Sequence, residues 1–342
     1  MVHVTAVGPT RESLTKPVRA ILLMRVVELA MASGRLVAER VFGVLRARLN
    51  EDQAVYARRQ LHQISVESYS LALLALRNAL GSEYIHVLHA LIAARNSDGS
   101  WPAFSGDDPQ GCWATAMAVL ALGAVRDRPA DLGLGIRWLL DERGREANWF
   151  WRWKFQAVDN SVKFDPAKYG WSWIPGTTSW VIPTAFSLIA LQKAKDGGLI
   201  PEPRFSERIS MGVRMLLDRM CPGGGWNAGN SAAFGVAYTP YIDATAIALL
   251  SLRRHGHEPG VRASLSWLAT QLPDCPSPYS LAWGLLAITA YGRKNQTIDT
   301  AARATEALIT ALGNCAATLD MSTIATCALA LEAIDGENVF RV

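Results

Sequence analysis

The sequence lacks the features that mark several classes of protein. Its 342 residues contain no continuous apolar run of roughly 18 residues or more, so no membrane-spanning helix is predicted. The five cysteines are scattered without a C-x-x-C spacing, which excludes a disulfide framework or a sulfur metal site. A net charge of +4 is too small to indicate nucleic-acid binding. The first residues do not resemble a secretory signal, so we expect a cytoplasmic protein.

The usual local signatures of catalysis are missing too. The sequence has no P-loop, no G-x-S-x-G elbow and no dinucleotide fingerprint. Its six histidines include no H-E-x-x-H motif. We therefore expect neither a cofactor nor a metal.

What the sequence does contain is a repeat of Ala- and Leu-rich blocks. Each block is long enough for a helix and apolar on most faces, which predicts a buried helix. Amphipathic segments alternate with these blocks. The apolar copies are 65–80, 111–125, 178–194, 239–254, 277–292 and 321–334; the amphipathic ones are 83–96, 130–143, 205–220, 259–272, 300–312 and a longer Arg-bearing segment over 16–49.

This alternation predicts an all-α fold, an (α/α)6 toroid of six hairpins with inner and outer helix rings. Residues 1–60 are expected to form an N-terminal amphipathic helical segment that supplies the outer helix of the first hairpin. Residues 61–342 form the remainder of a single toroid domain. The long connections 97–110, 144–177 and 221–238 all lead from an outer into an inner helix, so they meet at one end of the ring, where function is expected.

The longest connection, 144–176, is rich in aromatic and cationic residues. Two interpretations remain open. The rings could form a lid or an aromatic mouth over a cavity, or they could plug the loop onto the ring as a local core.

Some of these segments resemble a known family. The stretches "SDGSWPAF" (97–104), "CPGGGWNAGN" (221–230) and "WLATQ" (267–271) are similar to the QW repeats of squalene–hopene cyclases and related terpene cyclases. The apolar helices are similar to the inner helices of that superfamily, which also includes the β-subunits of protein prenyltransferases. The resemblance extends from about residue 65 onward.

The resemblance also implies a catalytic acid. Class II cyclases carry Asp-x-Asp-Asp-Thr-Ala at the start of an inner helix, and the middle Asp protonates the substrate. The matching stretch here runs from Tyr241 to Ala246 and places Asp243 at the protonating position, while Tyr241 and Ala244 replace the flanking carboxylates. The alternative is a helix-start carboxylate bonded to backbone or to the rim loop.

The prenyltransferase pattern fits less well. The zinc-binding motifs of that family match "PSPYS" (276–280) and "ATC" (325–327), where Pro276, Pro278 and Ala325 stand in ligand positions. No zinc is therefore expected.

These observations lead to one main hypothesis and two alternatives. The first is a terpene-cyclase-like enzyme that cyclises a lipophilic isoprenoid by protonation, with Asp243 as the proton donor. This hypothesis requires an open cavity inside the ring of helices. The aromatic residues expected to line it and stabilise cations are Tyr241, Trp113, Trp171, Trp173, Trp180, Tyr279 and Trp283.

The second hypothesis is a non-catalytic toroid that binds a lipid or a protein at its aromatic rim. The third is a carbohydrate-active toroid with a carboxylate pair such as Asp108 and Asp243. Two interpretations of the Arg-bearing N-terminal helix are open: peripheral contact with an anionic membrane, which would favour a lipophilic substrate, or docking of its apolar side on the ring.

Overall fold

The structure is a computed structural model. It describes residues 36–52, 63–79, 81–106, 110–125, 129–130, 132–157, 162–201, 203–292 and 295–342. Most of the Arg-bearing N-terminal segment, and the acidic pair Asp107 and Asp108, lie outside these residues. The predicted membrane contact through that segment and the predicted carboxylate pair with Asp108 therefore stay predictions.

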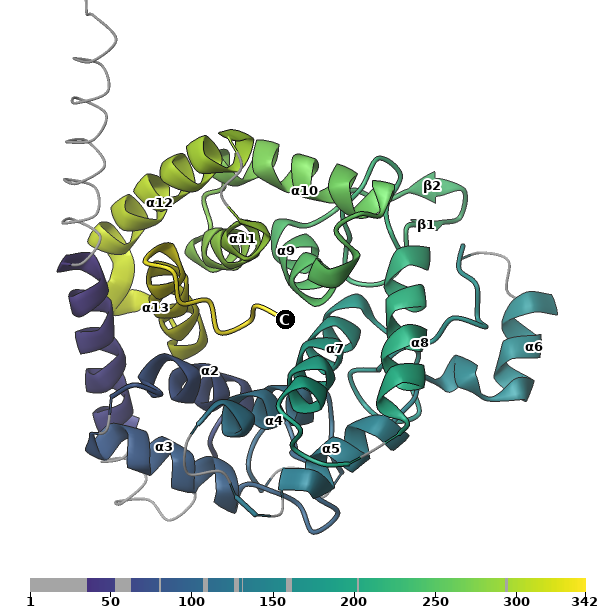
Figure 1. The fold of residues 1–342 in the computed structure, drawn as a ribbon, viewed down its shortest axis with the longest axis horizontal. Coiled ribbons are helices and arrows are strands. Elements are labelled where there is room, and N and C mark those ends of the chain that lie inside the picture. Colours follow the sequence, from purple (N-terminus) through teal and green to yellow (C-terminus); the bar gives the residue numbers. More distant parts are fainter. Residues whose placement is uncertain are drawn as a thin grey trace, which may run out of the picture.

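Apolar helices form an inner ring, as the repeat predicts (Figure 1). Each contacts the next in chain order, and α13 contacts α2, so the ring closes. α4 illustrates the reason, because every side chain from Ala114 to Leu122 is buried. The inner helices are α2 (Val66–Leu76), α4 (Ala114–Ala124), α7 (Val181–Asp196), α9 (Ile242–Ser251), α11 (Pro278–Tyr291) and α13 (Met321–Ile334).

The amphipathic helices pack around the inner ring and complete the toroid (Figure 1). A helix over 36–52 lies between α3 and α12 in this outer ring. The other outer helices are α3 (Ser82–Ala93), α5 (Leu132–Asp141), α8 (Phe205–Asp218), α10 (Pro259–Gln271) and α12 (Asn295–Cys315). Two further elements lie outside both rings: the short helix α6 (Trp149–Ala157) and a hairpin of β1 (Ala232–Ala233) and β2 (Val236–Ala237).

Three buried tryptophans link the two rings in the same way. Trp101 donates from Nε1 to the carbonyl of Leu91 in α3, at 2.7 Å. Its backbone N–H donates to Thr115 Oγ1 in α4 at 2.9 Å, and that hydroxyl donates back to the Trp101 carbonyl at 3.2 Å. One residue therefore satisfies an unpaired carbonyl in the last turn of an outer helix and fixes the start of the next inner helix.

The same set of bonds recurs at the next two hairpins. Trp171 donates to Leu139 of α5 at 2.8 Å and pairs with Thr184 of α7. Trp226 donates to Leu216 of α8 at 2.6 Å and pairs with Thr245 of α9. We call each set of bonds a Trp–Thr tie.

Two of the ties also hold the following outer helix close. A Cβ placed on Gly135 of α5 would lie 2.8 Å from the Trp101 ring, and one on Gly212 of α8 would lie 2.7 Å from the Trp171 ring. Only glycine allows this approach without a shift of the ring.

The segment after α13 turns into the middle of the ring (Figure 1). Phe340 is fully buried there, with its ring 5.0 Å from that of Trp283. Asn338 donates to the carbonyl of Leu286 at 2.7 Å, and Arg253 donates to the carbonyl of Val342 at 3.0 Å. The ring axis is therefore filled from the end where the inner helices finish.

In the described part of the chain, we find no helix with the length and apolar character needed to cross a bilayer.

The ties predict a specific loss of stability. Thr184→Val keeps the side-chain shape but leaves the buried N–H of Trp171 without an acceptor, which should lower the free energy of unfolding by about 1–3 kcal/mol. Urea denaturation followed by circular dichroism measures this difference. Thr310→Val on the exposed side of α12 is the control and should change stability by less than about 0.5 kcal/mol. Equal losses in both variants would contradict the importance of the ties.

Candidate functional site

We call the end of the ring where the inner helices begin the mouth. The first turns of these helices place one set of equivalent residues there. Ser65, Tyr241 and Ser277 are the N-caps of α2, α9 and α11. Two residues after each cap stand Glu67, Asp243 and Tyr279. Ile182 and Ser322 hold the same place on α7 and α13. Trp113, the N-cap of α4, corresponds to Ile182 and Asp243 in another way, because each of the three stands two residues before the threonine of a tie.

Glu67 and Asp243 lie on opposite sides of the ring axis. The inner helices follow one another as α2, α4, α7, α9, α11 and α13, so α2 and α9 stand on opposite sides of the axis. Tyr279 lies within electrostatic range of both carboxylates. Burial raises the pKa of its hydroxyl, and the charges of Glu67 and Asp243 raise it further. The mouth thus brings two carboxylates and a phenol together.

Glu67 differs from an ordinary surface glutamate. Burial, followed by the negative charge of Asp320, raises its pKa to about 7. Within the described residues no hydrogen bond or ion pair holds its carboxyl group in the ionised form, and burial outweighs the favourable helix dipole in the first turn of α2. Glu67 can therefore hold or release a proton near neutral pH.

Asp320 is the N-cap of α13 and is kept ionised. Burial alone would raise its pKa, but hydrogen bonds from Ser322 and Thr323 outweigh burial and hold it below the ordinary value. The backbone N–H of Thr323 donates at 2.9 Å and its hydroxyl at 2.7 Å. Two nearby carboxyl groups thus have pKa values moved in opposite directions, as in sites that perform acid–base chemistry.

Aromatic rings form a floor to the mouth, on the side that leads into the interior of the ring. The Tyr279 and Trp283 ring centres are 6.2 Å apart, and the Trp283 ring lies 5.5 Å from that of Phe186 on α7. The Phe186 ring approaches Trp113 at 6.2 Å, and Trp113 meets Trp173 edge to face at 5.0 Å. Because α7 and α11 are not neighbours in the ring, the contact between Phe186 and Trp283 spans its interior.

This packing changes the expected shape of the site. Phe186 and Trp283 are fully buried, and Phe340 packs beneath Trp283. The axis is occupied by side chains at and below this level, whereas the cyclase hypothesis assumes a deep hollow. The candidate site is therefore a mouth with an aromatic floor.

The structure brings together five of the predicted residues: Asp243, Trp113, Trp173, Tyr279 and Trp283. Asp243 is half-buried, and among the described residues its carboxylate makes no hydrogen bond or ion pair. The alternative in which it bonds to backbone or to the rim loop therefore finds no support there.

Three other predicted residues do not join this cluster of rings. Trp171 is wrong as a cavity residue, because its ring is buried in a Trp–Thr tie and the guanidinium of Arg208 stacks on it at 3.4 Å. Trp180 is the N-cap of α7 and its ring lies against Gly229. Tyr241 is the N-cap of α9, with its side chain exposed.

Two residues of the mouth were missed by the sequence reasoning, Glu67 and Asp320. The signal for Glu67 was present, because "SVESYSLALLAL" carries its acid at the same distance from the helix start as "YIDATAIALLSL". Asp320 shows the spacing of an N-cap, with Thr323 three residues later.

The long aromatic loop supplies Trp173 to the mouth, whereas its start and its helix lie elsewhere. Its start packs onto the ring, because the buried Glu146 accepts the N–H of Ser179 at 3.1 Å and faces Arg219 at 3.7 Å. Its helix α6 stands outside α8, on the outer side of the ring (Figure 1). The part around Trp171 is therefore a local core, and α6 is not a lid.

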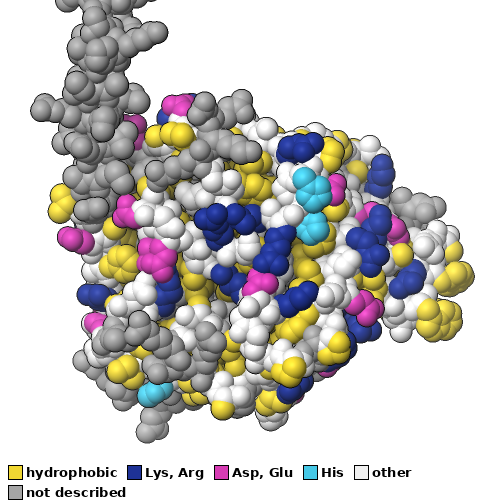
Figure 2. Space-filling model, viewed as in Figure 1, with side chains coloured by type: hydrophobic (Ala, Val, Ile, Leu, Met, Phe, Trp, Pro, Cys, Tyr) yellow, Lys and Arg dark blue, Asp and Glu magenta, His cyan; other side chains and the backbone are white. Residues whose placement is uncertain are grey.

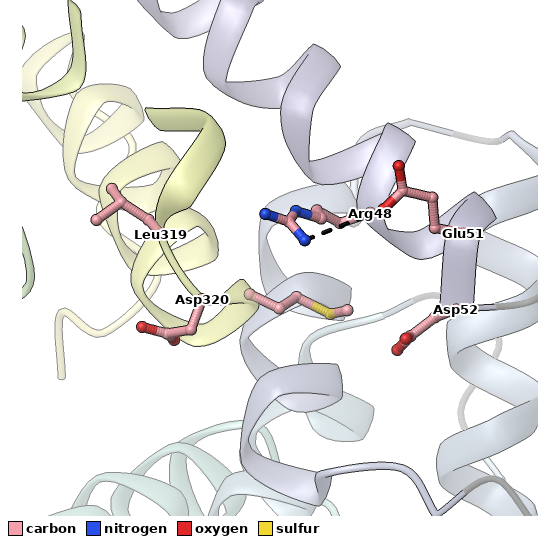
Figure 3. Close-up of a pocket in the computed structure, with 6 residues that line it drawn as sticks. Arg48, Glu51, Asp52, Leu319 and Asp320 are labelled. Atoms are coloured by element: carbon pink, nitrogen blue, oxygen red, sulfur yellow. Dashed lines mark ion pairs between the residues drawn. The ribbon is translucent and has the colours of Figure 1, made fainter. Parts of the chain in front are cut away.

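A pocket of about 220 Å³ adjoins the mouth on its outer side (Figure 3). It lies between the helix over 36–52 and the start of α13. Asp52 stands on one wall, where it accepts from the hydroxyl of Tyr69 at 3.4 Å, and Asp320 stands on the other. Within the described residues, no cluster of three or more histidine, cysteine or acidic side chains could hold a metal ion.

No family model matches the chain. No curated protein matches it either.

Among solved structures, the cellobiose 2-epimerase from Spirochaeta thermophila is similar with a TM-score of 0.47 and 13% identity, over 71% of this chain and 73% of that one. A variant of the type II terpene cyclase MstE from Scytonema, in complex with geranylgeranyl dihydroxybenzoate, gives 0.46 and 14%, over 86% of this chain and 98% of that one. The same cyclase without ligand gives 0.43 and 15%, over 79% of each chain. Likeness at this level says nothing about the reaction.

The raised pKa of Glu67 predicts a pH-dependent stability. The carboxyl group ionises near pH 4.5 when unfolded but near 7 when folded, so wild type should lose stability as the pH rises from about 4.5 to about 7. Glu67→Gln removes this dependence and should be more stable than wild type above pH 7, by up to roughly 3 kcal/mol. Urea titrations at several pH values measure the difference.

Asp320→Asn is the companion variant. It keeps an N-cap but removes the charge, so the transition should move to lower pH and stay above 4.5, because burial is the larger cause. Parallel pH profiles for wild type and Glu67→Gln would contradict the raised pKa.

Proposed function

We propose that this toroid is an enzyme that starts its reaction by protonating a lipophilic, isoprenoid-like substrate at the mouth of the ring. Two features of the mouth support this most. The pKa of Glu67 is raised to about 7, and the rings of Tyr279 and Trp283 belong to the aromatic floor of the same mouth. A proton donor must be neutral before it reacts, and burial supplies that condition for Glu67. We therefore assign the donor role to Glu67, with Asp243 as the facing carboxylate.

The chemistry needs few groups. The Glu67 carboxyl group donates its proton to a carbon–carbon double bond, which leaves a carbocation on the substrate. The faces of Trp113, Trp173 and Trp283 offer the negative charge that stabilises such a cation. Asp243 or water then takes a proton from a neighbouring carbon, so that the product is an isomer of the substrate.

The packed axis limits the substrate in this proposal. With Phe186 and Trp283 filling the interior, only the reacting end of a molecule can enter the mouth. Short isoprenoids, or the terminal unit of a longer one, therefore suit the site better than a polyene folded inside the ring.

Proton transfer can be traced with deuterium. Farnesyl and geranylgeranyl compounds incubated with the enzyme in D2O should give an isomer that carries one new deuterium on carbon, detected by mass spectrometry. Glu67→Gln should lower turnover by about 10²- to 10⁴-fold, as expected for the loss of a general acid. Glu51→Gln, an exposed glutamate in the adjoining pocket, is the control and should leave turnover unchanged. Full activity in Glu67→Gln would contradict the assignment.

A carbohydrate-active enzyme is the second candidate. The observation in its favour is that Glu67 and Asp243 face each other from opposite inner helices, as a general acid and a second carboxylate do in glycoside chemistry. In that case disaccharides would be converted and polyprenyl compounds would not. Binding of a polyprenyl compound without conversion of either substrate would favour the non-catalytic toroid.

A further inference from the structure

The outer edge of the toroid carries aromatic side chains that the mouth does not use. In α6, Trp149 is 76% exposed and Trp153 is 55% exposed, with Phe150 beside them. At the nearby hairpin, Phe234 is 81% exposed and Val236 is also exposed. In Figure 2, hydrophobic side chains gather at the right-hand edge, in the region that α6 occupies in Figure 1.

Backbone contacts join the two parts of this edge. The chain just after α6 pairs with the hairpin through a bridge between Val162 and Ala233, and Lys163 donates its N–H to Ala232 at 3.2 Å. We call the five side chains together the edge patch: Trp149, Phe150, Trp153, Phe234 and Val236. Both segments belong to loops that lead from an outer to an inner helix, so the patch lies at the mouth end of the ring.

The tip of the hairpin holds its aromatic residue at an energetic cost. Phe234 has a φ of 50° and Gly235 a φ of 77°, so both turn residues are left-handed. Such turns favour asparagine and glycine, and a bulky residue there is unusual. The turn therefore presents a large ring to solvent at a position where a small polar residue would be more stable, and such local strain often marks a functional site.

Helix α6 is also poorly supported by the rest of the protein. None of its nine residues is fully buried. Helices this short are marginal in water without an apolar surface to pack on. An apolar environment on its outer side would supply that surface.

The charged residues near the edge patch indicate what kind of surface covers it. The segment Trp149–Ala157 contains Arg152 and Lys154 and no acidic residue. Lys154 and Arg145 lie over the Trp151 ring, at 4.7 and 4.5 Å. Two neighbouring acids that the structure describes are engaged elsewhere: Glu146 is buried facing Arg219, and Asp165 pairs with Lys168. Exposed tryptophans interleaved with cations are typical of surfaces that lie in the headgroup region of a bilayer.

We propose that the edge patch docks the protein on a membrane with anionic lipids. The rings of Trp149, Trp153 and Phe234 enter the boundary between headgroups and acyl chains, and Arg145 and Lys154 meet the lipid phosphates. This brings the mouth end of the ring to the bilayer surface. The proposal does not depend on the reaction at Glu67.

Vesicle co-sedimentation of the full chain tests the docking. Wild type should bind vesicles of phosphatidylcholine with phosphatidylserine, and bind less well to phosphatidylcholine alone or at high salt. Trp149→Ser combined with Trp153→Ser should weaken binding by about tenfold or more, and Phe234→Asn should weaken it while preserving the turn. Lys154→Glu should reduce the preference for phosphatidylserine.

Ile85→Ser is the matched control, because Ile85 is an exposed apolar residue on α3, at the far side of the ring from α6. It should bind vesicles like wild type, and circular dichroism should show all variants folded. Three results would overturn the proposal: no vesicle binding by wild type, undiminished binding in the patch variants, or loss of concentration-dependent self-association, rather than of vesicle binding, in those variants.

Discussion

The architecture depends on a hydrogen bond from a buried indole to the last turn of an outer helix. Each Trp–Thr tie supplies an indole donor to a carbonyl in the last turn of an outer helix, and through the threonine it fixes where the next inner helix begins. On α4, α7 and α9 the ties therefore fix the level of the side chains at the helix start. Trp113, Ile182 and Asp243 share one level because Thr115, Thr184 and Thr245 do. The position of Asp243 opposite Glu67 rests on this register.

Several charged side chains at the two ends of the toroid suit the helix dipoles, because the inner helices all run in the same direction. Glu67, Asp243 and Asp320 stand at helix starts, where the helix dipole is positive. Arg77, Lys193 and Arg254 lie close together at the ends of α2, α7 and α9, where the dipole is negative and cations are favoured. Lys and Arg side chains also gather near the middle of the face seen in Figure 2. Burial of Glu67 outweighs the dipole, since its pKa rises to about 7, so this group can hold a proton near neutral pH.

The sequence predicted the toroid well because period and composition are local properties. All six Ala/Leu blocks are inner helices, and the ring closes as expected. The site was only partly predictable. Asp243 was found through a motif resemblance, whereas Glu67 needed the register between helices 176 positions apart in sequence. Trp171 was misplaced because a tryptophan in an aromatic loop looks the same whether it lines a cavity or ties two rings; only its spacing from Thr184 separates the two cases. The filled axis could not be foreseen, because the contact of Phe340 with Trp283 depends on where the last residues turn.

The central claim is that Glu67 carries a proton at near-neutral pH in the mouth of the ring. Infrared difference spectroscopy in D2O follows the protonated carboxyl group directly, and Glu67→Gln assigns the band. The account predicts a carboxyl band that disappears near pH 7 in wild type and is absent from the variant. A Glu67 band that disappears near the ordinary value of 4.5 would contradict it.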